Sequence, residues 1–280
     1  MIADWDTDTV LISDLLQQRY PTIERELRRI LEKHAVPLLT VRGTKDIWIR
    51  DYAPLQIQRG QFLQFRYYPD YLLDGDEHSI TKPSVFRSLP FIRKRRHSRL
   101  ILDGGNVVAT QQTAILTNKI ARENPKLVPS QIQSRLTELL NVERLIVIPK
   151  EPYDDIGHAD GMVRFLTDDI VVLNDYRKMS PTFAKRLEAT LTKAGLQLMR
   201  LPYRPELKKR AGIASAVGNY ANFLRVGNLV IIPKFGRNQD QEVQRLMAAW
   251  LPAVKLEALR CKPLAQEGGV LNCVTWTIRK

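Results

Sequence analysis

One structural unit recurs along this chain, and it limits the possible folds more than any other feature of the sequence. Each copy has a polar or glycine-rich strand start, a second short apolar strand, a helix and a third strand. Five polar landmarks lie roughly 50 to 60 residues apart, a period typical of repeat architectures: Asp51, Asp103, His158, Asn219 and Cys273. The sequence therefore predicts an α/β fold built from repeated units.

The units differ in how they are distributed along the chain. The three central units are complete, with a predicted second strand, helix and third strand at 113–116, 129–141 and 145–148, at 170–173, 181–194 and 197–201, and at 229–232, 239–250 and 254–259. The first unit has its helix (21–34) and strand (36–41) at the N-terminus, whereas a glycine-rich partner (267–276) stands at the C-terminus. These positions predict a five-bladed, pseudo-symmetric α/β propeller whose ring is closed by the N- and C-terminal segments.

Closure of such a ring would bring the polar strand starts towards a common centre. Two of these starts are themselves predicted to be strand. Residues 46–57 alternate apolar and polar side chains, and a strand that begins over 159–163 places His158 and Asp160 on one face. The whole chain, 1–280, is predicted to form a single domain.

Residues 66–99 interrupt the repeat and are predicted to form a long loop excursion, because they have no clean period. They contain the basic run 93–97, which is expected to be solvated. The chain has 43 Lys and Arg against 30 Asp and Glu, a net charge of +13. This excess leaves one rival open, a non-catalytic propeller that binds nucleic acid or an acidic protein. Because most of the positive charge is spread through predicted helices, a nucleic-acid partner is not expected.

No apolar run approaches the length of a membrane span, and the N-terminal residues mix Asp, Arg and Gln with apolar side chains. Neither a membrane segment nor a secretory signal is therefore expected. Two cysteines, Cys261 and Cys273, are too few for a disulfide framework or a thiolate metal site, which favours a cytoplasmic location. The four histidines have no clustered spacing, so neither a metal nor another cofactor is predicted.

A ring centre that collects the polar strand starts would have a distinctive chemistry. Cys273 is a potential nucleophile in its thiolate form, and His158 can accept and return protons near neutral pH. Asp51 and Asp160 can hold a planar cation through paired charge-assisted hydrogen bonds. Asp103 can orient His158 and favour its protonated form.

These residue types suit a guanidinium or amidinium substrate. The carbon of such a group is a weak electrophile because its positive charge is delocalised, and carboxylates can fix its plane while leaving the carbon open to attack. Thiolate addition, loss of a protonated amine and hydrolysis of the covalent thiouronium would complete a cycle. The predicted function is a metal-free hydrolase that acts on a guanidinium group and releases ammonia.

Five ordered motifs resemble those of the agmatine deiminase and bacterial (Porphyromonas-type) peptidylarginine deiminase family. They are WIRDYAP (48–54), LDGGNVV (102–108), GHADGMVRF (157–165), GNYANF (218–223) and GGVLNC (268–273). The resemblance covers about residues 20 to 276. It implies the pentein fold of the guanidine-modifying superfamily, a five-bladed α/β propeller, and a small-molecule or peptide guanidinium substrate. With agmatine as the substrate, the reaction would belong to putrescine biosynthesis.

The resemblance also implies residue roles. Cys273 is the implied nucleophile, His158 the acid and base, and Asp51 and Asp160 the guanidinium binders. Asp103 departs from the family pattern, which usually has Glu before the paired glycines. Its side chain is one methylene shorter, which leaves open whether it reaches His158 directly, through water or not at all.

Several alternatives stay open. Trp48 can stack on a guanidinium plane or belong to the core, and Asn222 and Asn219 can contact a ligand or fix turns. Cys261 is expected to be structural. An amidinotransferase or a dihydrolase would use the same mechanism, and the sequence leaves the identity of the guanidinium compound and the formation of a homo-oligomer open.

Overall fold

The computed structural model describes residues 1–72, 77–210 and 212–280. In this part of the chain the strands form five three-stranded sheets and one two-stranded sheet. The three-stranded sheets are β17–β1–β2 (Trp276–Ile278, Thr9–Ser13, Leu38–Val41), β3–β4–β5 (Leu55–Gln58, Gln61–Arg66, Lys94–Ile101), β6–β7–β8 (Val108–Ala109, Thr113–Thr117, Arg144–Ile148), β9–β10–β11 (Val163–Phe165, Ile170–Asn174, Gln197–Leu201) and β14–β15–β16 (Leu224–Val226, Leu229–Lys234, Lys255–Arg260). The α/β class and the repeated unit are confirmed.

Every three-stranded sheet has the same pairing. Its middle strand is antiparallel to one neighbour and parallel to the other. An antiparallel partner needs only a short turn, whereas a parallel partner needs a crossover connection that is usually a helix. In four sheets that connection contains a long helix: α2 (Pro21–Lys33), α5 (Pro129–Leu140), α6 (Pro181–Lys193) and α7 (Gln239–Trp250). Each lies within one residue of its prediction.

The helix α2 shows why these predictions are reliable. Its apolar residues recur at helical spacing, and Ile23, Leu27, Ile30 and Leu31 are all buried in the core. Proline stands at the first helical position of α2, α5 and α6, where the missing N–H is not needed. Periodicity and these start signals together define where each helix begins and which face it buries.

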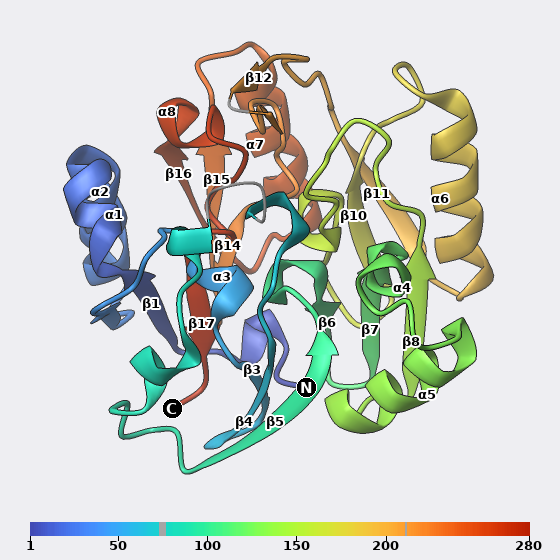
Figure 1. Ribbon diagram of the computed structural model, residues 1–280. Coiled ribbons are helices and arrows are strands. Elements are labelled where there is room, and N and C mark those ends of the chain that lie inside the picture. Colours follow the sequence, from blue (N-terminus) through green and yellow to red (C-terminus); the bar gives the residue numbers. More distant parts are fainter. Residues whose placement is uncertain (73–76, 211) are drawn as a thin grey trace.

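The first sheet joins the two ends of the chain. The strand β17 pairs antiparallel with β1, with Leu11 opposite Trp276. Figure 1 shows β17, in red, beside β1, in blue. This pairing agrees with the expectation that the terminal segments complete one another. The closed five-bladed ring itself stays a prediction, since within the described residues the five sheets are separate and none closes on itself.

Short helical turns stand at the starts of two predicted strands, so these predictions are wrong there and correct only at the ends of the segments, which form β3 and β9. Residues Ile49–Tyr52 form the helix α3 inside the segment predicted as a strand over 46–57, and Ala159–Gly161 form the 3₁₀ helix η6. A similar turn, η5 (Gly104–Asn106), follows Asp103. The α3 turn is fixed locally, because Asp46 accepts a hydrogen bond from the backbone N–H of Trp48 at 3.0 Å. These turns contact one another, α3 with η5 and η5 with η6, and the sheets in Figure 1 lie around α3.

The excursion predicted over 66–99 is correct only in part. It contains three short 3₁₀ helices, η2 (Asp70–Leu72), η3 (Glu77–Ser79) and η4 (Pro83–Phe86), and its residues 73–76 lie outside the described part. Its last residues belong to β5, which pairs parallel with β4. The basic run 93–97 therefore enters a strand and not a loop. Alternation of apolar and polar residues does not reveal this strand, because most side chains of the basic run in β5 face solvent.

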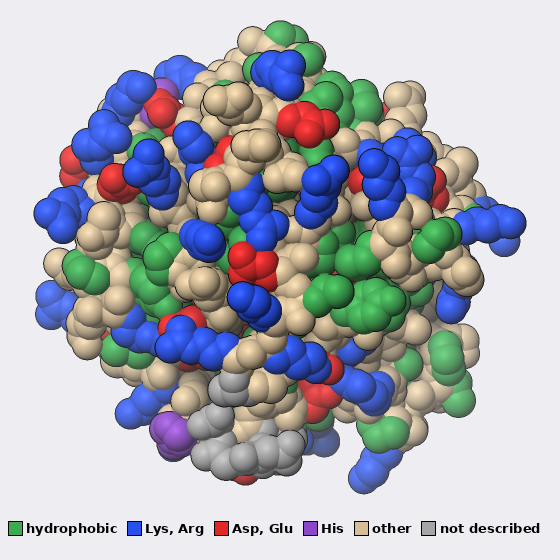
Figure 2. All heavy atoms as spheres, turned by 90° about the horizontal axis from the view of Figure 1, so that it is seen from above, with side chains coloured by type: hydrophobic (Ala, Val, Ile, Leu, Met, Phe, Trp, Pro, Cys, Tyr) green, Lys and Arg blue, Asp and Glu red, His purple; other side chains and the backbone are tan. Residues whose placement is uncertain are grey.

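The remaining described elements are short. They are η1 (Asp4–Asp6), α1 (Asp14–Arg19), α4 (Lys119–Glu123), α8 (Lys262–Ala265) and the two-stranded sheet of β12 (Lys209–Arg210) and β13 (Ile213–Ala214). Within the described ranges no helix has both the length and the apolar character needed to cross a membrane. On the face seen in Figure 2, Lys and Arg side chains are scattered among acidic and apolar groups and do not gather in one patch.

Candidate functional site

The polar turns and the C-terminal loop surround one cavity. Asp51 comes from α3, His158 and Asp160 from the η6 turn, and Cys273 from the loop that follows α8. The cavity has a volume of about 70 Å³, enough for a planar group of a few non-hydrogen atoms. Six of the predicted site residues line it: Trp48, Asp51, His158, Asp160, Asn222 and Cys273. Asp103, the seventh, is fully buried and contacts His158.

The thiol of Cys273 is partly buried beside an amide and a carboxylate. Its Sγ lies 3.4 Å from Asn222 Oδ1 and 3.8 Å from Asp160 Oδ2. Asn222 Oδ1 also accepts the backbone N–H groups of Asn272 at 3.1 Å and of Cys273 at 3.3 Å, so one amide fixes both the loop and the sulfur. Burial, and then the negative charges of Asp160 and Asp51, raise the pKa of the Cys273 thiol well above its usual value. These surroundings favour the protonated thiol.

Asp160 is buried and held by two asparagines, one at its carboxylate and one at its backbone. Its Oδ2 accepts a hydrogen bond from Asn272 Nδ2 at 2.6 Å, and its backbone carbonyl accepts one from Asn222 Nδ2 at 3.2 Å. Neither hydrogen-bond partner is charged, and the charge of the buried Arg50 acts on Asp160 without forming an ion pair with it in the described residues, so this carboxylate keeps an attraction for a cation that enters the cavity.

The imidazole of His158 lies between two carboxylates. Its Nε2 is 2.9 Å from Asp103 Oδ2, and its Nδ1 is 3.4 Å from Asp51 Oδ1. Burial lowers the pKa of His158, but the charge of Asp51 and the hydrogen bond to Asp103 outweigh it and raise the pKa to about 9. The imidazolium is therefore the favoured form at neutral pH, with a proton on each ring nitrogen.

Asp103 reaches His158 directly, which settles the question left open by its shorter side chain. The same oxygen, Oδ2, also accepts a hydrogen bond from Lys119 Nζ at 2.9 Å. Burial would raise the pKa of Asp103, but the Lys119 charge and the His158 hydrogen bond hold that pKa below its usual value. Asp103 is therefore an anion with two cationic partners.

Two glycines make these close approaches possible. A Cβ on Gly105 would lie 2.4 Å from Asp51 Oδ1 and 2.7 Å from His158 Nδ1, so any side chain there would separate the two groups. A Cβ on Gly269 would lie 2.4 Å from Trp48 Cζ3. Glycine at these positions lets the backbone pass directly behind the reactive side chains.

Trp48 packs against the largest core cluster and its side chain also lines the cavity, so stacking on a guanidinium plane stays a prediction. Asn222 likewise fixes the Cys273 loop and lines the cavity. Asn219 lines the cavity and accepts a hydrogen bond from Asn174 Nδ2 at 3.3 Å. Cys261 is fully buried in the core, as predicted.

Two residues of the site were not predicted, Lys119 and Asn272. Lys119 stands four residues before Glu123 on α4, a spacing that usually marks a surface ion pair, so nothing in the local sequence shows that it is buried. Asn272 immediately precedes Cys273 in the GGVLNC motif. Its place in that motif is a signal from which it could have been found.

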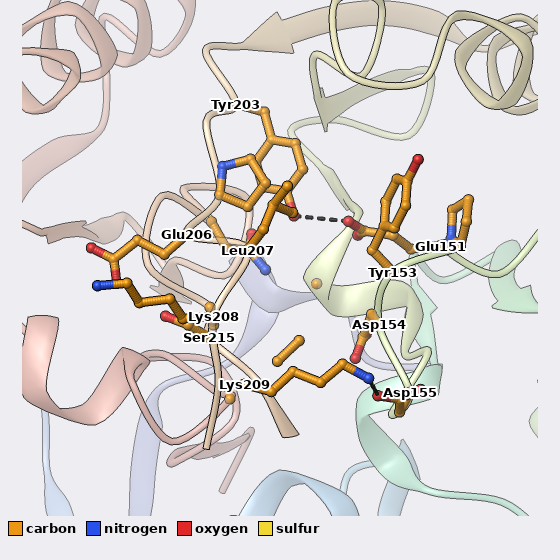
Figure 3. Close-up of a pocket in the computed structure, with 17 residues that line it drawn as sticks. Glu151, Tyr153, Asp154, Asp155, Tyr203, Glu206, Leu207, Lys208, Lys209 and Ser215 are labelled. Carbon is orange, nitrogen blue, oxygen red and sulfur yellow. Dashed lines mark hydrogen bonds and ion pairs between the residues drawn. The ribbon is translucent and has the colours of Figure 1, made fainter. Parts of the chain in front are cut away.

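A larger cavity, of about 290 Å³, adjoins the first. The two share the lining residues Asp154, Gly161, Asn219 and Gly268. Figure 3 shows its walls, where the Tyr203 hydroxyl donates a hydrogen bond to Glu151 at 2.8 Å and Lys209 pairs with Asp155 at 2.6 Å. The small cavity therefore continues into a wider one with aromatic, acidic and basic side chains.

Within the described ranges, no group of three or more His, Cys, Asp and Glu side chains is arranged to hold a metal ion. The carboxylates around the small cavity are instead engaged by imidazole, lysine and amide groups. That the chain needs neither a metal nor another cofactor stays a prediction.

The family described as Porphyromonas-type peptidyl-arginine deiminase matches residues 9–278. This range contains all five motifs and every residue that lines the small cavity. The chain belongs to the Porphyromonas-type peptidyl-arginine deiminase family. Deiminases are hydrolases that act on carbon–nitrogen bonds in linear amidines, so the predicted enzyme class is confirmed.

Relatives and solved structures of this family agree with the assignment. A "Putative agmatine deiminase" of Marinomonas sp. strain MWYL1 is 25% identical over 209 residues, which cover 64% of this chain and 57% of that protein. One of Latilactobacillus sakei is 25% identical over 319 residues, with coverage of 99% and 84%. The structure of an agmatine deiminase of Enterococcus faecalis superposes with a TM-score of 0.81 at 17% identity, covering 100% of this chain and 95% of that chain. At that identity the superposition shows the shared α/β fold alone. The predicted alternatives are not favoured by these findings.

Proposed function

We propose that this chain deiminates a guanidinium compound through a covalent intermediate on Cys273. One arrangement supports the proposal above all: a thiol, an imidazole held between carboxylates, and the carboxylates of Asp51 and Asp160 line one small cavity. The family of the chain supports the same reaction type.

Asp51 and Asp160 are assigned as the groups that hold the cation. A guanidinium carries its N–H donors in one plane, and carboxylates that accept them in pairs fix that plane. Trp48 forms a further wall of the cavity. The faces of the guanidinium plane then stay open, so that Sγ of Cys273 can approach the central carbon.

The substrate also supplies the positive charge that ionises the thiol. Asp51 and Asp160 keep the pKa of Cys273 high, and a bound cation offsets their negative charge. The thiol proton then passes to solvent. The thiolate forms only when the substrate is in place, which protects the sulfur from other reactions.

In the first half of the reaction, the thiolate adds to the guanidinium carbon and a C–S bond forms. His158, protonated at neutral pH because its pKa is about 9, gives a proton to one terminal nitrogen. The C–N bond to that nitrogen breaks and ammonia leaves. A thiouronium cation, covalently bound to Cys273, remains.

In the second half, neutral His158 takes a proton from water as the water oxygen adds to the same carbon. The C–S bond breaks and its electron pair returns to sulfur. The remaining hydroxyl proton is released and converts ammonia to ammonium, which leaves a neutral ureido product. Asp103 keeps the imidazole oriented through both halves, since it holds Nε2 at 2.9 Å.

Two structural expectations belong to the same proposal. We propose that the five three-stranded sheets form a five-bladed propeller closed by β1 and β17, and that residues 1–280 form one domain. The shared strand pairing of the five sheets and the pairing of the terminal strands support this arrangement.

The tail of the substrate is proposed to enter the wider cavity past Asp154 and Asn219. Both residues line the two cavities. The guanidinium compound is therefore agmatine, free arginine or arginine in a peptide, each of which has a tail beyond the guanidinium group.

The first test labels the thiol without knowledge of the substrate. Chloroacetamidine, a reactive mimic of guanidinium, is expected to alkylate Cys273 much faster than neutral chloroacetamide, as followed by mass spectrometry. The preference should disappear in Asp51→Asn and Asp160→Asn. Equal rates with both reagents would contradict the assignment of a cation-binding thiol site.

The second test measures ammonia release from agmatine, arginine and short arginine peptides. Release from at least one of these, abolished in Cys273→Ala, is expected. Release that is unchanged in Cys273→Ala would overturn the covalent mechanism.

A further inference from the structure

We infer that Lys119 is a positioning residue that keeps Asp103 anionic and limits how tightly His158 holds its proton. The consequence for the rate rests on the function proposed above, whereas the charge states of Asp103 and His158 do not. Lys119 would thus set the pH range over which His158 can both give and take a proton.

The first observation is the burial of Lys119. Its side chain is fully buried at the start of α4, a position in which lysine is rarely found unless it is paired. Its Nζ lies 2.9 Å from Asp103 Oδ2, 3.0 Å from Glu123 Oε1 and 3.4 Å from Asp70 Oδ1. The ring of Tyr71 lies 5.1 Å from the same nitrogen. The ammonium is therefore fully enclosed, and its charge is only weakly screened by solvent.

The second observation is that Lys119 and His158 share one oxygen. Both Lys119 Nζ and His158 Nε2 lie 2.9 Å from Asp103 Oδ2, so the two nitrogens are less than about 6 Å apart. At that distance the ammonium acts on both partners. It stabilises the carboxylate and disfavours the imidazolium, and both effects move the protonation of the Asp103–His158 pair to lower pH.

The third observation is the excess of negative charge around the imidazole. The groups that face His158 or its partners come from every neighbouring turn: Asp51 from α3, Asp70 and Tyr71 from η2, Asp103 from the start of η5, Lys119 and Glu123 from α4, Asp154 from the loop before η6, and Asp160 from η6. Lys119 is the one fully buried cation among these groups in the described residues, since Arg122, which pairs with Asp70, is exposed. With carboxylates alone, His158 would hold its proton too tightly to return it during the proposed cycle.

The decisive experiment measures the titration of His158 itself. The C–H proton signals of the four imidazoles are followed by NMR against pH, and the His158 signal is assigned with His158→Gln. Lys119→Met is expected to raise the midpoint of His158 by on the order of one pH unit, because a nearby positive charge is lost. Lys119→Arg keeps the charge and should stay close to the wild-type midpoint.

Arg122→Met is the matched control. Arg122 stands on the same helix and also pairs with Asp70, but its side chain is 58% exposed. The Arg122→Met variant should leave the pH midpoint of the His158 titration unchanged. If a guanidinium substrate is found, the alkaline limb of the pH–rate profile should shift in the same direction as the NMR midpoint in Lys119→Met and return in Lys119→Arg.

An unchanged or lowered midpoint in folded Lys119→Met would overturn the inference and leave Lys119 as a purely structural partner of Glu123. If Lys119→Met does not fold, Lys119→Gln keeps a polar group at the site without the charge and must raise the midpoint in the same way. If no substrate releases ammonia, the proposed function is wrong. The inference about Lys119 is still tested, because the NMR titration of His158 does not depend on turnover.

Discussion

On one side of the small cavity neutral amides hold the reactive group, and on the other side charges hold it. The thiol side comprises Asp160, Asn222, Asn272 and Cys273, where the amide side chains of Asn222 and Asn272 make most of the contacts and Arg50 Nε adds a hydrogen bond to the Asn272 carbonyl at 3.4 Å. The imidazole side comprises Asp51, Asp103, Lys119 and His158, in which carboxylates and cations alternate.

This difference explains how one site can keep a proton on the imidazole of His158 and release a proton from the thiol of Cys273. On the imidazole side the charge pattern exists before any substrate binds, so His158 holds its proton with a pKa of about 9. On the thiol side the buried Arg50 lies next to the Cys273 loop, but no cation forms an ion pair with the carboxylate of Asp160 in the described residues, and burial together with the charges of Asp160 and Asp51 raises the pKa of Cys273. A bound guanidinium changes the thiol side most, because in the described residues no cation is paired with the carboxylate of Asp160 there.

The largest expected effect comes from removing the thiol. Cys273→Ala should lower ammonia release by at least about 10⁴-fold, because the covalent route is lost. Its thermal unfolding should stay close to that of the wild type, since the side chain is small and only partly buried. Steady-state assays and differential scanning calorimetry measure both quantities.

Cys261→Ala provides the control for that comparison. The Cys261 side chain is fully buried in the core, so its truncation should cost about 1 kcal/mol of unfolding free energy and leave the turnover rate unchanged. Loss of activity in Cys261→Ala with retention in Cys273→Ala would reverse the assignment of the two cysteines.

The next effect concerns the charge of Asp160. Asp160→Asn keeps the shape of the side chain but removes the anion that faces the cation, and kcat/KM should fall by about 10²- to 10⁴-fold through the loss of two charge-assisted hydrogen bonds. Asp175→Asn is the control, because that carboxylate pairs with the exposed Arg177. A fall of less than about threefold in Asp160→Asn would show that the thiol side does not bind the cation.

The sequence predicted the framework of the fold well, because its signals are local. Each long helix has a 3.6-residue apolar period, and three of the four also have an initial proline, as in α2. The turns around the site were harder to predict. Residues 46–57 alternate in sequence, yet α3 interrupts them, since the hydrogen bond from the Trp48 N–H to Asp46 just before α3 and the close approach of η5 favour a helical turn. Tertiary contact overrides the period there.

The difference between local sequence signals and tertiary contacts also explains which residues of the site were predicted. Cys273, His158 and the three aspartates were predicted because their chemistry and their motifs single them out. Lys119 was not, because its role depends on burial, and burial of α4 against Asp103 follows from the packing of distant segments. A lysine at helical spacing from a glutamate gives the same local signal on a surface as in a core.

Asn222 offers a smaller effect that tests how much its amide contributes to holding the thiol side. Asn222→Ala leaves the backbone N–H groups of Asn272 and Cys273 without their acceptor, which should cost about 1–3 kcal/mol of unfolding free energy and reduce turnover by about 10- to 100-fold. Urea unfolding and the ammonia assay measure these effects. Asn219→Ala, which loses one 3.3 Å contact to Asn174, should change stability less.

The smallest effect belongs to the imidazole side and appears as a pH dependence of stability. Because the folded protein raises the pKa of His158 from 6.5 to about 9, the stabilising contribution of its imidazolium is complete below pH 6.5 and is lost as the pH rises through 9. The free energy of unfolding should therefore fall by about 2 kcal/mol between pH 7 and 9. Asp51, with a pKa of about 7, is half titrated at pH 7, so it contributes most of its fall at lower pH and a small further fall at the start of this range.

His158→Gln should remove most of that slope, whereas His97→Gln, which removes an exposed imidazole, should keep it. The range from pH 7 to 9 is chosen because the raised pKa of Cys273 makes the thiol contribute mainly above pH 9. Chemical unfolding at several pH values measures the slope directly. Equal slopes in the wild type and His158→Gln would mean that charges do not hold the imidazole side, and the contrast between the two sides of the cavity would disappear.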